Sequence, residues 1–149
     1  MNAEEVYVDP SALVALYIHE AGSRSLSAWR TRLGGNALPV THHGRTEIIN
    51  AICRVAFLGH LDETRLMEAL ADFAADFAHG RLHQVDILWR AALNHAAELS
   101  RRHTPRLGTR SLDVLHVGCA LELKLRHFLT FDERQQKLAL AAGLKLVRL

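Results

Sequence analysis

Short β-branched and aromatic runs alternate with longer segments of helical periodicity along this chain. Residues 6–8 form the first run, and residues 38–41, 82–87, 127–131 and 144–149 form the others. Between them, apolar residues recur at spacings of three and four, as on the buried face of a helix. Strands that alternate with helices build a parallel sheet covered on both faces. The sequence therefore predicts an α/β fold: a three-layer α/β/α sandwich with a central parallel sheet.

Capping residues and stop signals predict where the helices lie. Pro10 and Ser11 can open the first helix, and the Gly34-Gly35 pair can close the second. Thr104-Pro105 and Gly108 indicate a loop after a helix that ends near Arg102. The predicted helices cover residues 12–19, 23–33, 46–58, 62–79, 88–102, 111–124 and 133–142. Within 62–79, the stripe Leu66, Leu70, Phe73 and Phe77 belongs either to the core or to a dimer face.

The composition is typical of one soluble domain that spans residues 1–149. Apolar residues make up 49% of the chain and charged residues 23%, which suits a globular protein with a core. Charges interrupt every apolar run, so no segment is expected to span a bilayer. The acidic N-terminus lacks the pattern of a secretory signal, so a cytoplasmic location is expected. Cys53 and Cys119 lie within helical patterns and are interpreted as reduced core residues.

Four acidic residues occupy similar structural positions. Asp9 directly follows the first predicted strand, and Asp132 directly follows the strand 127–131. Asp113 lies in the first turn of a helix, and Glu47 opens a helix after a strand. Because the carboxyl ends of parallel strands share one edge of a sheet, these side chains are expected to meet there. The simpler interpretation, that each acid only caps a helix, applies to any one of them.

Four carboxylates at one edge would repel one another unless a proton or a cation neutralises them. Two unit charges ~4 Å apart cost about 4 kcal/mol at an effective dielectric constant of ~20. Oxygen ligands suit hard cations, so Mg²⁺ or Mn²⁺ is the expected occupant. Such an ion can polarise a phosphodiester and activate an attacking water. We therefore interpret Asp9, Glu47, Asp113 and Asp132 as metal ligands and catalytic residues.

Two hydroxyl residues are candidates for a supporting role. Ser11 lies two residues after Asp9 and can hold a metal-bound water, although helix capping explains it equally well. Thr130 lies two residues before Asp132, on the same side of a strand, where its hydroxyl can orient a carboxylate. A β-branched residue in a strand also needs no functional explanation.

The histidines do not suggest a ligand set. His116 follows Asp113 by three residues and shares its helix face, yet a core histidine bonded to a carbonyl is the favoured interpretation. His42 and His43 are adjacent, and in a strand they would point to opposite faces, so a two-histidine site is not expected. The ten histidines contain no HExxH spacing.

A group of arginines precedes Asp113 in the sequence. Guanidinium groups beside an acidic pocket can bind the phosphates that the carboxylates would repel. Any one of them can equally be an ordinary solvated residue. As a group they are predicted RNA contacts: Arg101, Arg102, Arg106 and Arg110.

The segments around the acids resemble the successive motifs of PIN domains, and especially of VapC-type toxins. They are VYVDPSALVALYIHE, TEIINAICR, RSLDVLHVGCALELK and HFLTFDERQQKLALAAGLKLV. The resemblance spans nearly the whole chain in the right order, and the family's acidic positions map to Asp9, Glu47, Asp113 and Asp132. It implies Mg²⁺- or Mn²⁺-dependent endoribonuclease activity, dimerisation, and neutralisation by a small antitoxin that covers the pocket. Residues 79–110 match no motif, so the choice of RNA stays open.

Three functions are consistent with these patterns. The favoured hypothesis is an endoribonuclease, the toxin of a toxin–antitoxin pair. The alternative from another class is a catalytically silent PIN fold that acts as a binding or assembly module, which the presence of all four acids disfavours. An unrelated phosphotransfer enzyme is the weakest option, because Asp9-Pro10-Ser11 lacks a second aspartate and no glycine-rich phosphate loop occurs.

Overall fold

The computed structural model describes residues 1–33 and 36–149. The predicted Gly34-Gly35 stop signal lies outside the described residues. The strands are β1 (Val6–Val8), β2 (Leu38–Thr41), β3 (Leu82–Val85), β4 (His127–Leu129) and β5 (Lys145–Leu146). The α-helices are α1 (Pro10–Leu13), α2 (Ser23–Arg32), α3 (His42–Phe57), α4 (Glu63–Ala78), α5 (Trp89–Leu107), α6 (Ser111–Glu122) and α7 (Glu133–Ala141). Two short 3₁₀ helices, η1 (Ala3–Glu5) and η2 (Val14–Leu16), flank β1 and α1.

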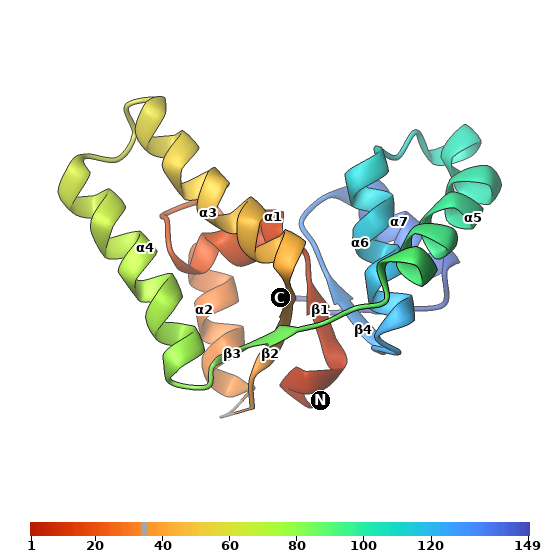
Figure 1. Ribbon diagram of the computed structural model, residues 1–149, viewed down its shortest axis with the longest axis horizontal. Coiled ribbons are helices and arrows are strands. Elements are labelled where there is room, and N and C mark those ends of the chain that lie inside the picture. The colour runs from red at the N-terminus through yellow and green to blue at the C-terminus, as the bar shows by residue number, and fades with distance from the viewer. Residues whose placement is uncertain (34–35) are drawn as a thin grey trace.

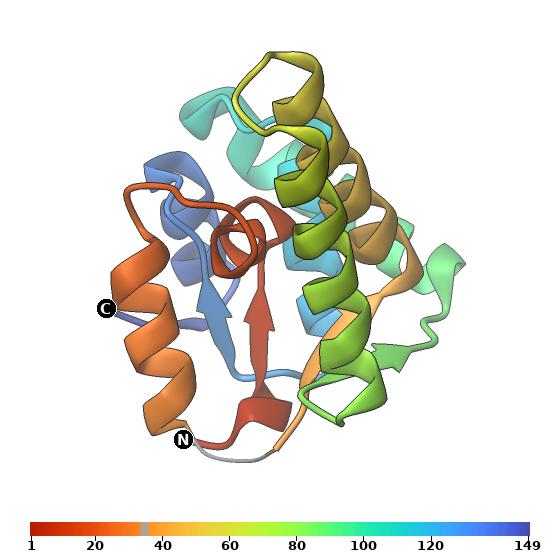
Figure 2. The ribbon, with the colours of Figure 1, turned by 90° about the vertical axis from the view of Figure 1, so that its left-hand side faces the viewer.

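The strands form two parallel ladders that lie side by side. In the first, β1 pairs with β4 and β4 with β5; in the second, β2 pairs with β3. β1 and β2 are neighbours, but no ladder joins them among the strands that the structure describes. The parallel direction confirms the sequence prediction, while the expected single sheet is divided between these ladders. Figure 2 shows β1 and β4 pointing the same way at the centre of the molecule.

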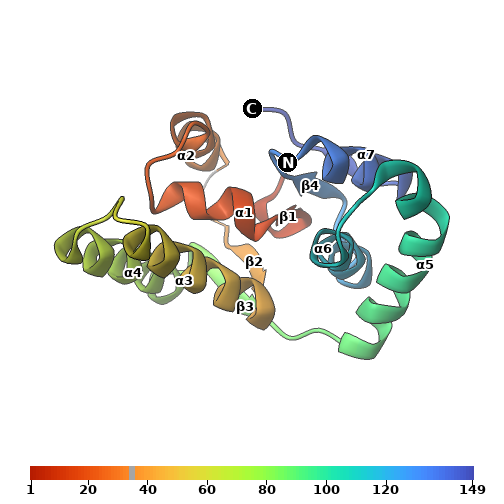
Figure 3. The same ribbon diagram turned by 90° about the horizontal axis from the view of Figure 1, so that it is seen from above.

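Two apolar cores cover the two faces of the sheet. Val6 and Val8 of β1 join one core, with residues of α1, α2, α3 and α4. Tyr7, between them in sequence, joins the other core, with residues of α5, α6 and α7. This alternation is what the two-residue period of a strand requires when both faces are buried. The two groups of helices lie on opposite sides of the strands in Figures 1 and 3. The three-layer α/β/α sandwich is therefore confirmed.

The apolar stripe of α4 belongs to the first core. Phe73 is buried there, and Leu66, Leu70 and Phe77 pack against it while partly exposed. Of the two cysteines, only Cys119 is buried as expected; Cys53 is exposed, and both are free. Within the described residues, no helix is both long and apolar enough to cross a membrane.

Several element boundaries differ from the sequence predictions. α3 begins at His42, because Thr41 caps it with a hydrogen bond to the Gly44 amide. α5 continues through Pro105 to Leu107 and ends at Gly108, whose left-handed backbone (φ 64°) forms the C-cap. Proline in the last turn removes only one hydrogen bond, so the helix persists. The predicted helix 12–19 is α1 followed by η2, and β3, β4 and β5 are shorter than predicted.

Close contact between α5 and α6 depends on Gly118. A Cβ atom at this position would lie 2.8 Å from the Ala92 carbonyl oxygen and 3.1 Å from the Ala96 amide nitrogen. Both are backbone atoms, which cannot move without displacing α5. Gly118 thus sets the distance between α5 and the helix that carries Asp113 and His116.

The Gly118→Ala variant should be less stable than the native chain by about 1–3 kcal/mol, the usual cost of overpacking. The free energy of unfolding in urea measures this difference. Helix propensity alone predicts the opposite sign, because alanine is favoured over glycine in a helix by about 1 kcal/mol. A stabilised variant would therefore show that the α5–α6 contact is not limiting.

Candidate metal-binding and catalytic site

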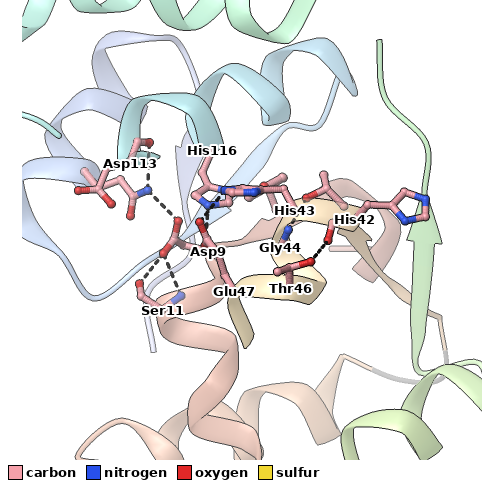
Figure 4. Close-up of polar contacts among 12 residues, drawn as sticks. Asp9, Ser11, His42, His43, Gly44, Thr46, Glu47, Asp113 and His116 are labelled. Atoms are coloured by element: carbon pink, nitrogen blue, oxygen red, sulfur yellow. Dashed lines mark hydrogen bonds and ion pairs between the residues drawn. The ribbon is translucent and has the colours of Figure 1, made fainter. Parts of the chain in front are cut away.

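Asp9 lies at the carboxyl end of β1 and is held on several sides. It is 2% exposed, and its amide continues the β1–β4 pairing by donating to the Leu129 carbonyl at 2.9 Å. Its Oδ2 accepts hydrogen bonds from the amide of Ser11, at 3.0 Å, and from the Ser11 hydroxyl. Its Oδ1 accepts from Nε2 of Gln135 at 2.8 Å. Asp9 therefore caps α1 and keeps a fixed orientation (Figure 4).

Gln135 of α7 connects the three aspartates. Its Nε2 donates to Oδ1 of Asp9 and, at 3.2 Å, to the backbone carbonyl of Asp113. The backbone N–H of Gln135 donates to Oδ1 of Asp132 at 2.9 Å, which makes Asp132 the N-cap of α7. Gln135 is 1% exposed, and its Oε1 is buried without a partner in the described part of the chain. The side chain thus fixes Asp9 relative to the elements that carry Asp113 and Asp132.

The charges of the three aspartates act on one another. Partial burial raises the pKa of the Asp113 carboxyl, and the negative charges of Asp9 and Asp132 raise it further. His116 and Arg110 oppose this rise. Burial is the larger cause of this rise, and the two neighbouring negative charges add to it because they disfavour ionisation of Asp113. Folding has therefore brought together acids that are up to 123 positions apart in the sequence, Asp9 and Asp132.

Glu47 points toward two histidines. It lies in the second turn of α3, one turn after His43, whereas the sequence prediction placed it at the helix start. Its Oε2 lies 2.9 Å from Nε2 of His116, and its Oε1 lies 2.8 Å from Nε2 of His43. Hydrogen bonding and the charge of His116 lower the pKa of Glu47 despite the opposing effect of its burial. Figure 4 shows Glu47 and His116 directed at each other.

His116 of α6 is a buried polar residue that contacts both the sheet, at Tyr7, and α3, at Glu47. It is 2% exposed; burial lowers its pKa, but the bond to Glu47 and the charges of Asp9, Glu47 and Asp113 raise it to a net value above normal. Its Nδ1 lies 2.6 Å from the hydroxyl of Tyr7. The expected carbonyl partner is therefore wrong: the partners are a tyrosine and a carboxylate. His42 and His43 also start a helix, not a strand, so the argument from opposite strand faces does not apply.

Two adjacent hollows share Asp113 and Arg110. One is a cleft of about 680 Å³ that also includes Asp9, Ser11, Glu47 and His116. The other has a volume of about 430 Å³ and includes Asp132 and Arg134. The structure thus places all four predicted acids in two adjacent hollows, with Glu47 lining the larger and Asp132 the smaller.

The predicted arginines are not grouped as expected. Arg101, Arg102 and Arg106 lie on α5, because that helix continues where a loop was predicted, and Arg101 pairs with Glu98 at 3.0 Å. Of the four, Arg110 lines the hollows. Thr130 is buried, and its hydroxyl accepts a hydrogen bond from the Asp132 amide at 3.1 Å.

Sequence reasoning missed several residues at the site. Arg54 lines the larger cleft, and Arg134 lines the smaller hollow. Arg54 lies seven residues after Glu47, a helical spacing that could have identified it. No sequence signal distinguished Gln135 from Gln136 beside it, because burial, not residue type, sets its role.

The family comparison agrees with this geometry. The PIN domain family model matches residues 6–141. The chain belongs to the PIN domain family. PIN domains are generally nucleases, and the matched region contains all four acids and both histidines that face Glu47. A search of curated proteins found no match.

Proposed function

We propose that this PIN domain is a Mg²⁺- or Mn²⁺-dependent endoribonuclease and the toxin of a toxin–antitoxin pair, acting in the cytoplasm as one domain over residues 1–149. The observation that supports it most directly is that the negative charges of Asp9 and Asp132 act on Asp113, where they add to the effect of burial in raising the pKa of its carboxyl. If these acids served only to cap helices, their mutual repulsion would simply destabilise the fold. A site that binds a hard dication would gain from it.

The residues present fit such an ion. Asp9 Oδ2 accepts two hydrogen bonds, but Oδ1 accepts one among the described residues and so keeps a lone pair. Asp132 is exposed and Asp113 half-buried, so their oxygens are accessible from the hollows. Asp9, Asp113 and Asp132 would hold the ion, with Glu47 nearby. When bound, it would supply charge stabilisation to the phosphodiester and lower the pKa of a water.

Other residues of the site would position the acids, bind the substrate and accept a proton. Ser11 and Gln135 keep Asp9 from rotating, and Thr130 holds the backbone at Asp132. Arg110 would bind a phosphate beside the acids. Glu47 would accept the proton of a water that attacks phosphorus in line. The expected products are a 3′-hydroxyl and a 5′-phosphate, with no covalent protein intermediate.

Cleavage of RNA by the purified, antitoxin-free protein tests this proposal. Total RNA and single-stranded DNA should be incubated with Mn²⁺, Mg²⁺ or a chelator, and the new RNA ends mapped. We expect metal-dependent RNA cuts with 5′-phosphate ends. Intact RNA together with Mn²⁺ binding in calorimetry would contradict the nuclease, and failure to bind Mn²⁺ as well would favour the silent binding module.

The partners follow from the same proposal. A small antitoxin would cover the larger cleft, whose apolar residues Val55, Leu58 and Leu112 continue from the acids. We also expect a homodimer, which light scattering would detect. A short open reading frame directly beside this gene would support the toxin assignment, and co-purification of its product would test it.

Arg110→Ala should weaken RNA binding by a similar factor for all sequences. Its guanidinium is exposed at the junction of both hollows, where a phosphate contact carries no base information. The slope of log affinity against log salt should fall by about 0.7 for one phosphate contact on a single strand. Binding titrations of a labelled RNA at several salt concentrations measure both quantities.

Arg101→Ala is the matched control. Arg101 is exposed and pairs with Glu98 on α5, away from the residues that line the hollows. We expect an unchanged slope. If both variants lose RNA affinity equally, the predicted RNA contacts would instead extend along α5 to Arg102 and Arg106.

A further inference from the structure

Two histidines and a carboxylate converge beside the acidic site. His43 and Glu47 lie one turn apart on α3, and His116 faces them from α6. One ligand atom from each residue lies within 4.8 Å of the other two. Figure 4 shows these side chains meeting from the two helices. This donor set differs from that of the aspartates, which offer oxygen alone.

Two buried atoms of this cluster contact each other as an ion pair without forming a well-aligned hydrogen bond. Nε2 of His43 and Oε1 of Glu47 lie 2.8 Å apart, yet they do not meet the geometry of a hydrogen bond. Both atoms are buried and have no hydrogen-bond partner among residues 1–33 and 36–149. Buried polar atoms without a hydrogen bond are uncommon, so this pair of atoms is a candidate for binding a ligand. A cation between the two atoms would satisfy both.

The surroundings orient the histidines. Tyr7, buried beneath the cluster, holds Nδ1 of His116 at 2.6 Å and leaves Nε2 directed toward Glu47. Metal-binding histidines are usually oriented in this way, through a hydrogen bond to the nitrogen that does not bind the metal. The His43 ring stacks on that of His116, with centroids 5.7 Å apart, and the edge of Trp89 packs against it.

Ligand type selects the class of ion. Two imidazole nitrogens and one carboxylate suit Zn²⁺ and related transition metals, whereas Mg²⁺ prefers oxygen. Zinc–ligand bonds of about 2.0–2.2 Å require the three ligand atoms to be roughly 3.3–3.5 Å apart in a tetrahedral site. His43 is 35% exposed and can rotate to reach such a geometry. A fourth position would stay open to the cleft.

We propose that His43, Glu47 and His116 form a second metal site, selective for Zn²⁺-class ions, whose occupation keeps Glu47 from accepting the proton of the attacking water. Zinc would then inhibit the enzyme through a carboxylate that serves both sites. The binding part of this inference stands on the cluster alone. The inhibitory part rests on the proposed nuclease function.

Zinc binding can be measured without nuclease activity. The metal-free full-length chain should be titrated with Zn²⁺ in calorimetry at pH 8 with Mg²⁺ in large excess, and with Co²⁺ to record visible ligand-field bands. We expect one zinc site per chain. His43→Ala should weaken zinc affinity by at least about tenfold, since even outer-sphere changes cost 10–100-fold. His43 is partly exposed, so this variant should fold; circular dichroism checks it.

His42→Ala is the matched control, because His42 is an adjacent, exposed histidine that pairs with Asp86. It should keep native zinc affinity. The inference is overturned if the native chain binds no zinc under these conditions, if His43→Ala binds it as tightly as the native chain, or if both variants lose affinity equally.

A second measurement separates the two proposals. The ratio of RNA cleavage rates with and without zinc should be well below one for the native chain and nearer one for His43→Ala. His43-dependent zinc binding without any cleavage would leave the metal site standing and contradict the nuclease. Cleavage that zinc does not inhibit would contradict the shared Glu47 and leave the nuclease standing.

Discussion

The Asp9→Asn variant should lose RNA cleavage by more than about 100-fold. Changing an outer-sphere partner already costs 10–100-fold in metal affinity or activity, and Asp9 is proposed to bind the ion directly. Single-turnover cleavage of a labelled RNA and Mn²⁺ calorimetry should both show the loss. A variant that cleaves at the native rate would refute the role assigned to Asp9.

The stability of Asp9→Asn is a balance of two effects. An asparagine amide must face either the Ser11 donors or Nε2 of Gln135, and a buried donor without an acceptor costs about 1–3 kcal/mol. Relief of the repulsion with Asp113 offsets part of this cost. Urea unfolding should therefore show a modest loss, too small to explain inactivity. Asp62→Asn, the same change at the exposed cap of α4, should leave cleavage unchanged.

Phe128→Ala should lower the free energy of unfolding by about 3–5 kcal/mol, the range for phenylalanine removed from a core. Phe128 is fully buried at the centre of β4 and pairs in register with Tyr7. Their rings stack with centroids 5.5 Å apart and planes 3° apart. Since domains are stable by about 5–15 kcal/mol, this is a large share of the total. Urea unfolding with an unchanged m-value measures it.

A second phenylalanine provides the control for Phe128. Phe57 is 86% exposed at the end of α3, so Phe57→Ala should change stability by no more than about 0.5 kcal/mol. Similar losses of stability in both variants would mean that the contribution of Phe128 does not come from its burial.

Because Tyr7 contacts His116, we also expect Phe128→Ala to lower zinc affinity.

The fold was predictable because its signals are local. Strand–helix alternation, the Asp9-Pro10 boundary and the helical periodicity of residues 62–79 each depend on neighbouring residues, and the layers follow from them. The prediction failed at Pro105, where proline was taken as a helix end although Gly108 supplies the actual C-cap three residues later. It also made β5 too long, because the length of the strand is set by its pairing with β4, a tertiary property.

The positions of Asp9 and Asp132 after strands were predictable from the sequence, but the surroundings of the histidines were not. His116 acquires its partners from β1 and α3, elements 109 and 69 positions away in the sequence. His43 was misjudged because the start of α3 was placed four residues too late, and a strand and a helix direct adjacent residues differently. Whether the four acids bind one ion together stays a prediction.

The hydrogen bond between Glu47 and His116 joins α3, which packs in one core, to α6, which packs in the other. The proposed reaction centre therefore lies between the two cores. The distances within it depend on how the part that contains α3 packs against the part that contains α6. Chimeras that exchange one half between homologues should fold more often than they retain activity. Substitutions that lie far from the site but shift one core relative to the other should therefore change the rate of cleavage, although they contact no residue of the site.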